Sequence, residues 1–289
     1  MGGFKMSLVV GEISYTNMLP LYYYLDRDHL NKLGCMFIPQ VPSQLNAGMS
    51  KGIIDVGGIS SFSYGEHVDK YTILPDLSVS SPQSVGSIFL FSKVPLTQLD
   101  GKKVALTSSS ATSVNLLKII LQTFYGLNVE YEVMKPDFDE MLKDHDACLL
   151  IGDDAILTFW NLKEKIHRYD LGQMWYEHTK LPMTFAVLAV RNDILEKENH
   201  RIATLFDNFI TSKKKCIENN YSEMISSIRQ DFGGSKSFWE NYFHGLNYDL
   251  SERHIEGLYH YYDLATDLSL LKKVNTISLW SALDRCHSI

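Results

Sequence analysis

The sequence predicts an α/β protein built as two lobes with a central cleft. Apolar runs short enough to be buried strands alternate with segments whose apolar residues repeat at helical spacing, which is typical of parallel sheets. The 289 residues suffice for one large or two medium domains. A β-rich run at residues 183–190 follows a compact central segment and is expected to return the chain to the first lobe. We therefore predict lobe one from residues 1–93 and 185–289, lobe two from residues 94–184, and two crossovers between them.

The opening unit, residues 8–25, sets the pattern. Leu8, Val9 and Val10 form the apolar run of a buried strand, residues 11–17 are small or polar, and Pro20 stands near the start of the next apolar run, where a helix favours it. A helix that begins after a strand presents unpaired N–H groups and a positive partial charge, which suit an anion. A capped helix with nothing bound would leave the same pattern.

The rest of lobe one continues the alternation. Ser43 is expected to cap a helix that ends at Gly52, and Ser60 to begin another. Pro75 makes its strand an edge or bulged strand, and residues 93–95 are expected to cross to lobe two. The predicted strands are 36–41, 53–56, 72–77 and 87–91, and the predicted helices are 43–52 and 60–67.

In lobe two, a hydroxyl-rich turn at residues 107–113 separates a strand from a helix with apolar residues at helical spacing. The helical tail is amphipathic, as its spacing of Leu205, Phe206 and Phe209 shows. The predicted strands are 104–106, 129–133, 147–151 and 166–170, and the predicted helices are 114–125, 137–143, 200–217, 221–232, 236–243 and 252–268.

Composition excludes several classes of protein. The net charge is −7 and no basic patch with interleaved aromatic residues is present, so nucleic acid is not an expected partner. The longest cationic run, residues 213–215, is interpreted as a solvated helix face. The four scattered cysteines indicate reduced thiols in a cytoplasmic protein. No signal peptide and no run of 18 apolar residues is found, so no membrane association is predicted.

The motifs of the common enzyme classes are absent. The chain has no GxSxG, P-loop, GxGxxG or HExxH motif, and its ten histidines are dispersed, so no metal site is predicted. Four polar corners remain, each between a strand and a helix: residues 14–17, 60–61, 107–113 and 152–154. Helix caps alone could explain each one. Together they suggest a cleft for a small carboxylated molecule, in either an enzyme or a binding protein. The candidate contacts in these corners are Ser14, Tyr15, Ser60, Ser61, Ser110, Thr112, Ser113 and Asp153.

Several segments carry a family resemblance. GEISYTNMLPLYYYL, GIIDVGGIS, the hydroxyl turn ending in TSV, ACLLIGDDAI and the YDLG…W…T…LP run resemble, in order, the chorismate dehydratase family of the futalosine route to menaquinone. The resemblance covers about residues 8–193. It implies the class II periplasmic-binding-protein-like fold in a cytoplasmic enzyme.

The resemblance also implies the chemistry. Water is lost from chorismate to give 3-[(1-carboxyvinyl)oxy]benzoate, and aromatisation of the ring drives the reaction without a redox cofactor or metal. Asn17 and Ser87 match the family's catalytic positions, and Ser110, Thr112 and Ser113 match its anion-binding turn.

Two positions depart from the family pattern. Ala111 stands where many members have arginine, which weakens any role for a guanidinium group, and Lys180 replaces a usual glycine. The general base stays open. Glu12, Asp153 and Asp154 are the nearest carboxylates, with helix capping the expected job of the two aspartates; a substrate carboxylate could instead act as its own base.

Two alternative functions stay open. The related enzyme that cleaves cyclic dehypoxanthine futalosine would be favoured by a required histidine, for which His167 and His178 are the second-lobe candidates. A non-catalytic protein that binds small anions is the other. The sequence leaves the oligomeric state undetermined.

Overall fold

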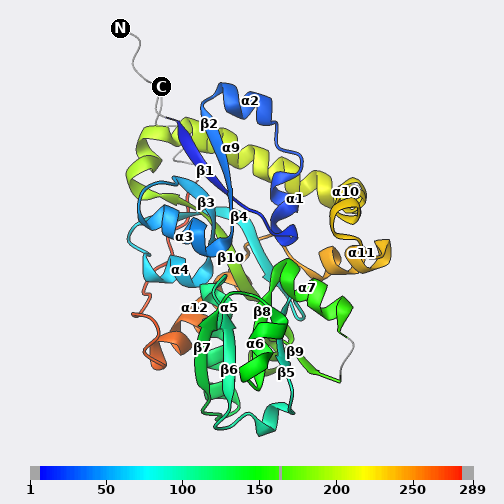
Figure 1. The fold of residues 1–289 in the computed structure, drawn as a ribbon. Helices are drawn as coiled ribbons and strands as arrows, with labels where there is room; N and C mark the ends of the chain where they lie inside the picture. The colour runs from blue at the N-terminus through cyan, green and yellow to red at the C-terminus, as the bar shows by residue number, and fades with distance from the viewer. Residues whose placement is uncertain (1–6, 163–164, 282–289) are drawn as a thin grey trace.

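The computed structural model describes residues 7–162 and 165–281, and these residues form two α/β lobes, as predicted (Figure 1). Each lobe is built on one five-stranded sheet. The first sheet has the order β2 (Cys35–Gln40), β1 (Leu8–Ile13), β3 (Val56–Ser60), β10 (Met183–Arg191), β4 (Tyr71–Ser81). The second has the order β7 (Glu130–Met134), β6 (Lys103–Thr107), β8 (Ala147–Ile151), β5 (Ile88–Ser92), β9 (His167–Asp170).

Parallel pairing brings helix starts together at one edge of each sheet. In the first sheet β1 pairs in parallel with β2 and β3, and in the second β6 pairs in parallel with β7 and β8. The carboxyl ends of these strands therefore lie at a common edge, where ligands bind in open α/β sheets. The elements that begin there are the 3₁₀ turn η1 (Thr16–Met18) with α1 (Leu19–Tyr22), α4 (Ser61–Glu66), α5 (Ala111–Ile119) and α7 (Gly152–Asn161).

The remaining helices cover the sheets. The long α9 runs across lobe one, where it packs against α1, β4 and β10, and α12 contacts β10, α4 and α5 (Figure 1). The tail from α9 onward thus belongs mainly to lobe one but reaches the second lobe through α12. The bounds of the remaining helices are α2 (Arg27–Lys32), α3 (Pro42–Ser50), α6 (Phe138–Asp144), α8 (Leu171–Thr179), α9 (Asn192–Glu218), α10 (Ser222–Phe232), α11 (Lys236–Gly245) and α12 (Glu252–Asp267). Two short turns, η2 (Leu96–Gln98) and η3 (Ile120–Phe124), complete the helical segments.

The first crossover lies earlier than residues 93–95. Strand β5, assigned to lobe one from the sequence, pairs with β8 and β9 in the second sheet. The chain therefore crosses between β4 and β5. Asp170 holds this segment, because its carboxylate accepts hydrogen bonds from the hydroxyl group of Ser84 (2.7 Å) and from the N–H groups of Val85 and Gly86. The return strand β10 pairs with β3 and β4, as predicted.

Two local predictions in lobe one were wrong. Helix α3 has Val41 rather than Ser43 at its N-cap position, with no side-chain cap. Strand β3 begins at Val56, not at residue 53, and Gly57 and Gly58 lie inside it rather than after it. The two glycines give room for neighbours: a Cβ atom at Gly58 would lie 2.5 Å from the Met18 Cε atom.

Burial tests two further interpretations. Lys213 is buried and its Nζ atom lies 2.6 Å from the Asp249 carboxylate, so the solvated-face interpretation was wrong for this residue. Cys35, Cys148 and Cys216 are buried, whereas Cys286 lies outside the described residues.

Lys180 occupies a backbone conformation that suits glycine. It is the C-cap residue of α8 with φ 59°, and its Nζ atom lies 5.2 Å from the centroid of the Tyr176 ring. A residue with a Cβ atom pays about 1–2 kcal/mol in this left-handed conformation. Its replacement of the usual glycine therefore affects the backbone, and Lys180 does not line the cavity described below.

We expect Lys180→Gly to raise the melting temperature by about 2 °C, because it removes about 1 kcal/mol of backbone strain. Lys180→Ala is the matched control, since it also loses the contact with Tyr176 but keeps a Cβ atom. Thermal unfolding of both variants checks this. A glycine variant no more stable than the alanine variant would contradict it.

Candidate functional site

A small cavity lies between the carboxyl edges of the two sheets. Its volume is about 40 Å³, room for a few water molecules. It is therefore closed around less space than a metabolite needs, and the lobes have to part to admit one. The residues that line it come from both lobes: Ile13, Tyr15, Asn17, Met18, Pro42, Ser60, Val79, Ile88, Ser110, Ser113, Ile151, Gly152, Phe185 and Ala186.

Asn17 presents an unused polar atom to this cavity. Its carboxamide Oδ1 atom is buried and has no hydrogen-bond partner among the described residues. A buried polar atom without a partner is costly, and such atoms are rare in native proteins. Asn17 does not cap the turn η1, whose N-cap position is Tyr15. Its side chain is therefore available for a ligand.

Three serines reach the cavity at helix starts, as their positions between strand and helix predict. Ser60 caps α4 by accepting a hydrogen bond from the N–H group of Ser63, and Ser110 caps α5 in the same way with Ser113. The Ser110 hydroxyl group also donates to Ser113 Oγ at 3.2 Å. The site thus offers neutral hydroxyl groups at the positive ends of two helices.

Asp153 and Asp154 join the lobes instead of capping α7, which has no side-chain cap. The Asp153 carboxylate accepts hydrogen bonds from the Thr16 hydroxyl group (2.6 Å) and the Thr16 N–H group (3.3 Å). The Tyr15 hydroxyl group donates to Asp154 at 3.4 Å. Gly152, with φ 58°, lets the two lobes approach each other closely here, because a Cβ atom at this position would lie 2.9 Å from the Tyr15 ring.

Burial shifts the acidity of this contact. It raises the pKa of Asp153 to about 6, although both hydrogen bonds from Thr16 favour the charged form. Burial likewise raises the pKa of Tyr15 to about 12, so this hydroxyl group stays protonated and can act as a donor.

Five of the predicted site residues do not line the cavity. Ser14 is exposed, and Ser61 donates its hydroxyl hydrogen to the Thr184 carbonyl at 2.7 Å. Thr112 was expected to face the cleft, but its Oγ1 atom accepts from the Phe62 N–H group at 3.0 Å across the lobes. The other two, Asp153 and Ser87, lie behind the cavity wall in contact with Thr16 and Tyr242 respectively.

No carboxylate or histidine of the described chain lines the cavity. Glu12 is held away by Arg27 in a two-point ion pair with distances of 2.7 and 2.9 Å. His178 stacks on Phe124 with centroids 4.6 Å apart, and His167 is exposed.

Sequence reasoning missed Thr16 and Tyr242, which contact Asp153 and Ser87. Thr16 belongs to the ISYTN motif, which was a usable signal. Tyr242 lies in the tail, 155 residues from Ser87, and nothing local marks it.

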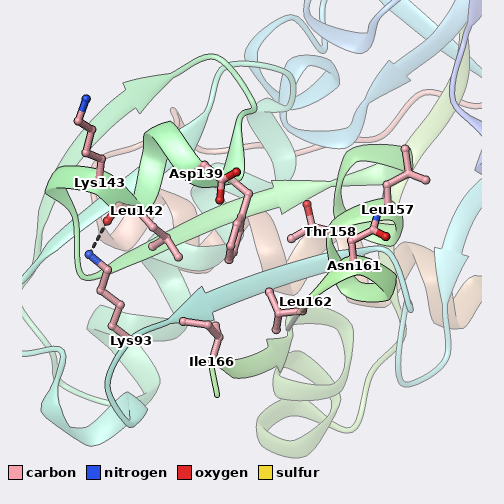
Figure 2. Close-up of a pocket in the computed structure, with 10 residues that line it drawn as sticks. Lys93, Asp139, Leu142, Lys143, Leu157, Thr158, Asn161, Leu162 and Ile166 are labelled. Atoms are coloured by element: carbon pink, nitrogen blue, oxygen red, sulfur yellow. Dashed lines mark hydrogen bonds between the residues drawn. The ribbon is translucent and has the colours of Figure 1, made fainter. Parts of the chain in front are cut away.

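A larger hollow of about 640 Å³ lies on the outer side of lobe two (Figure 2). Lys93 and Lys143 stand at one end of it, and the Lys93 ammonium group donates to the Leu142 carbonyl (Figure 2). It shares no residue with the cavity between the lobes. None of the predicted site residues reaches it, so we do not assign it to the active site.

Two other features are absent from the part of the chain that the structure describes. Within residues 7–162 and 165–281, no three histidine, cysteine or acidic side chains are grouped so that they could hold a metal ion. No described helix has the length and apolar character needed to span a membrane.

Solved structures define the class of protein to which this fold belongs. A protein of Archaeoglobus fulgidus matches with a TM-score of 0.72 at 20% identity, over 93% of this chain and all of that one. The alkanesulfonate-binding protein of Xanthomonas axonopodis, bound to MOPS, matches with a TM-score of 0.70 at 14% identity, over 94% of this chain and 96% of that one. The chain therefore has the periplasmic-binding-protein-like fold.

Sequence comparison gives the family. A family model described as menaquinone biosynthesis matches residues 8–267, and the chain belongs to this family. A chorismate dehydratase of Thermus thermophilus is 34% identical over 199 residues, which are 64% of this chain and 70% of that protein. A chorismate dehydratase of Campylobacter jejuni is 29% identical over 62% of this chain and 66% of that protein. A 1,4-dihydroxy-6-naphtoate synthase of Thermus thermophilus is 26% identical over 53% of this chain and 54% of that protein.

We expect Asp153→Asn to stabilise the protein above pH 6. A pKa raised from 3.8 to about 6 means that folding favours the protonated form, so this group's contribution to stability falls as the pH rises from about 4 to about 6. Asparagine does not titrate and escapes this penalty of about 3 kcal/mol.

Thermal unfolding from pH 4 to 8 checks this. The gain should appear between pH 4 and 6 and stay constant above. Asp263→Asn, on the exposed face of α12, is the control for the loss of one negative charge. A loss of stability at pH 8 would contradict the assignment.

Proposed function

We propose that this protein removes water from chorismate to give 3-[(1-carboxyvinyl)oxy]benzoate, and is thus a hydro-lyase of menaquinone biosynthesis. The observation that carries the proposal is the cavity, where the unpartnered Asn17 carboxamide meets Ser60, Ser110 and Ser113. Two of the relatives bear the name of this activity. A cavity with neutral donors and no carboxylate suits a substrate that is itself a dicarboxylate.

The reaction needs little from the protein. A ring proton leaves to a base, the ring hydroxyl group leaves as water, and the new double bond completes an aromatic ring. Because no protein carboxylate or histidine of the described chain lines the cavity, a carboxylate of the substrate is the base in this proposal. Asn17 then orients the reacting groups: its unpartnered Oδ1 atom can accept the hydrogen of the departing hydroxyl group, and its amide nitrogen can donate to the substrate carboxylate.

The same cavity argues against the enzyme that acts on cyclic dehypoxanthine futalosine. A catalytically required histidine would favour that alternative, and neither His167 nor His178 lines the cavity. The roles of Ser60, Ser110 and Ser113 in this proposal are to hold substrate carboxylates at the starts of α4 and α5.

The activity is tested by adding chorismate to the purified protein and following the ultraviolet change of aromatisation, with mass spectrometry to identify the product. The chorismate dehydratase of Thermus thermophilus serves as the positive control. A folded protein that leaves chorismate unchanged under conditions where the relative converts it would refute the proposed function.

We expect Asn17→Asp to lower kcat by about 10²–10³, the range for loss of one positioned donor, with the melting temperature changed by only a few degrees. The new carboxylate would repel the substrate and remove both amide donors. The control is Asn161→Asp, which places the same charge in the outer hollow of lobe two (Figure 2).

The two variants together show whether the active site is the cavity between the lobes or the outer hollow of lobe two. Near-normal turnover by Asn17→Asp would remove the main protein participant from the mechanism. A large loss from Asn161→Asp alone would move the active site to lobe two's outer side.

A further inference from the structure

Tyr242 connects the helical tail to the back of the active site. It lies on α11, it is buried, and its hydroxyl group donates to Ser87 Oγ at 2.9 Å. Its ring packs beside Gly86, where a Cβ atom would lie 3.3 Å from Tyr242 Cδ2. Gly86, with φ 69°, thus brings the backbone before Ser87 close to the ring.

Ser87 is in turn tied to the start of α7, because its carbonyl oxygen accepts a hydrogen bond from the N–H group of Gly152, the residue before Asp153, at 2.7 Å. Thr16 donates both its hydroxyl and N–H hydrogens to the Asp153 carboxylate. Tyr242, Ser87, Thr16 and Asp153 therefore form one buried network. It joins α11, the residue before β5, η1 and α7, and thereby links the two lobes.

The network ends next to the catalytic candidate. Asn17 follows Thr16 directly, and its own Oδ1 atom has no partner among the described residues. No described residue therefore holds the Asn17 oxygen by a hydrogen bond before a ligand binds, and the backbone at Thr16 sets its position.

We propose that Tyr242 is a positioning residue for the dehydration: through Ser87 and Thr16 its hydroxyl group sets the placement of the Asn17 carboxamide in the cavity. This inference rests on the proposed function. Tyr242 does not line the cavity and touches no reacting atom in this account. Burial raises the pKa of the Tyr242 hydroxyl group, so the group stays protonated and can donate to Ser87.

Tyr242→Phe tests the proposal because it keeps the ring and its contacts with Phe238, Trp239 and Phe243 while removing one oxygen. A misplaced Asn17 should lower kcat by about ten- to a hundredfold and leave KM within about twofold. Tyr248→Phe is the matched control. Tyr248 is as deeply buried, but its hydroxyl group has no partner among the described residues, so kcat should not change.

A double-mutant cycle with Ser87→Ala separates positioning from general loosening. If Tyr242 acts through Ser87, the double variant should be about as slow as the slower single variant. Multiplied losses, or an unchanged kcat in a folded Tyr242→Phe protein, would overturn the proposal. If Tyr242→Phe does not fold, Ser87→Ala removes the same hydrogen bond from the other side, and the same drop in kcat at constant KM is required.

A spectroscopic readout keeps this inference distinct from the proposed function. The side-chain amide signal of Asn17 can be assigned by its absence from the spectrum of Asn17→Asp. We expect Tyr242→Phe to shift this signal and Tyr248→Phe to leave it in place, whatever the substrate. If the protein does not convert chorismate but this shift is seen, the proposed function fails and the positioning role stands; if the signal does not move, the positioning role fails.

Discussion

The hydrogen bonds between Thr16 and Asp153 are the contact on which the closed form depends. Thr16 begins the 3₁₀ turn η1 in lobe one, and Asp153 lies in the first turn of α7 in lobe two. Together with the packing of Tyr15 on Gly152, these hydrogen bonds hold the carboxyl edges of the two sheets next to each other. The contact keeps the Asp153 carboxylate buried, although burial disfavours its charged form. The cavity, and the position of Asn17 within it, exist because this contact forms.

Much of the site could be predicted because it follows from local rules. A hydroxyl-rich segment after a strand places its serines at a helix start, and Ser60, Ser110 and Ser113 lie there. The sequence alone could not predict in which direction each side chain of such a turn points. Thr112 therefore faced Phe62 and not the cleft, and Asp153 faced Thr16 and not its own helix end.

Pairings between distant segments were the other limit. Strand β5 is buried throughout and would suit either sheet, so its apolar residues gave no sign of the crossover's place. The turn before it is set by Asp170, whose carboxylate also caps α8 through the Gln173 N–H group. Gly172 permits this, because a Cβ atom there would lie 2.6 Å from the Gln83 carbonyl oxygen. The YDLG motif thus serves the crossover, which no periodicity could reveal.

The neutral lining of the cavity has a consequence for the speed of encounter. Carboxylate ligands are usually drawn to clefts by lysine or arginine side chains, which raise association rates at low salt. Here the chain carries a net charge of −7, and the described cavity offers hydroxyl and amide groups only. A dianion therefore approaches against the field of the protein, and added salt should speed its capture by screening that repulsion. Recognition in this protein is short-ranged: it begins only when the lobes are open and the ligand already lies between them.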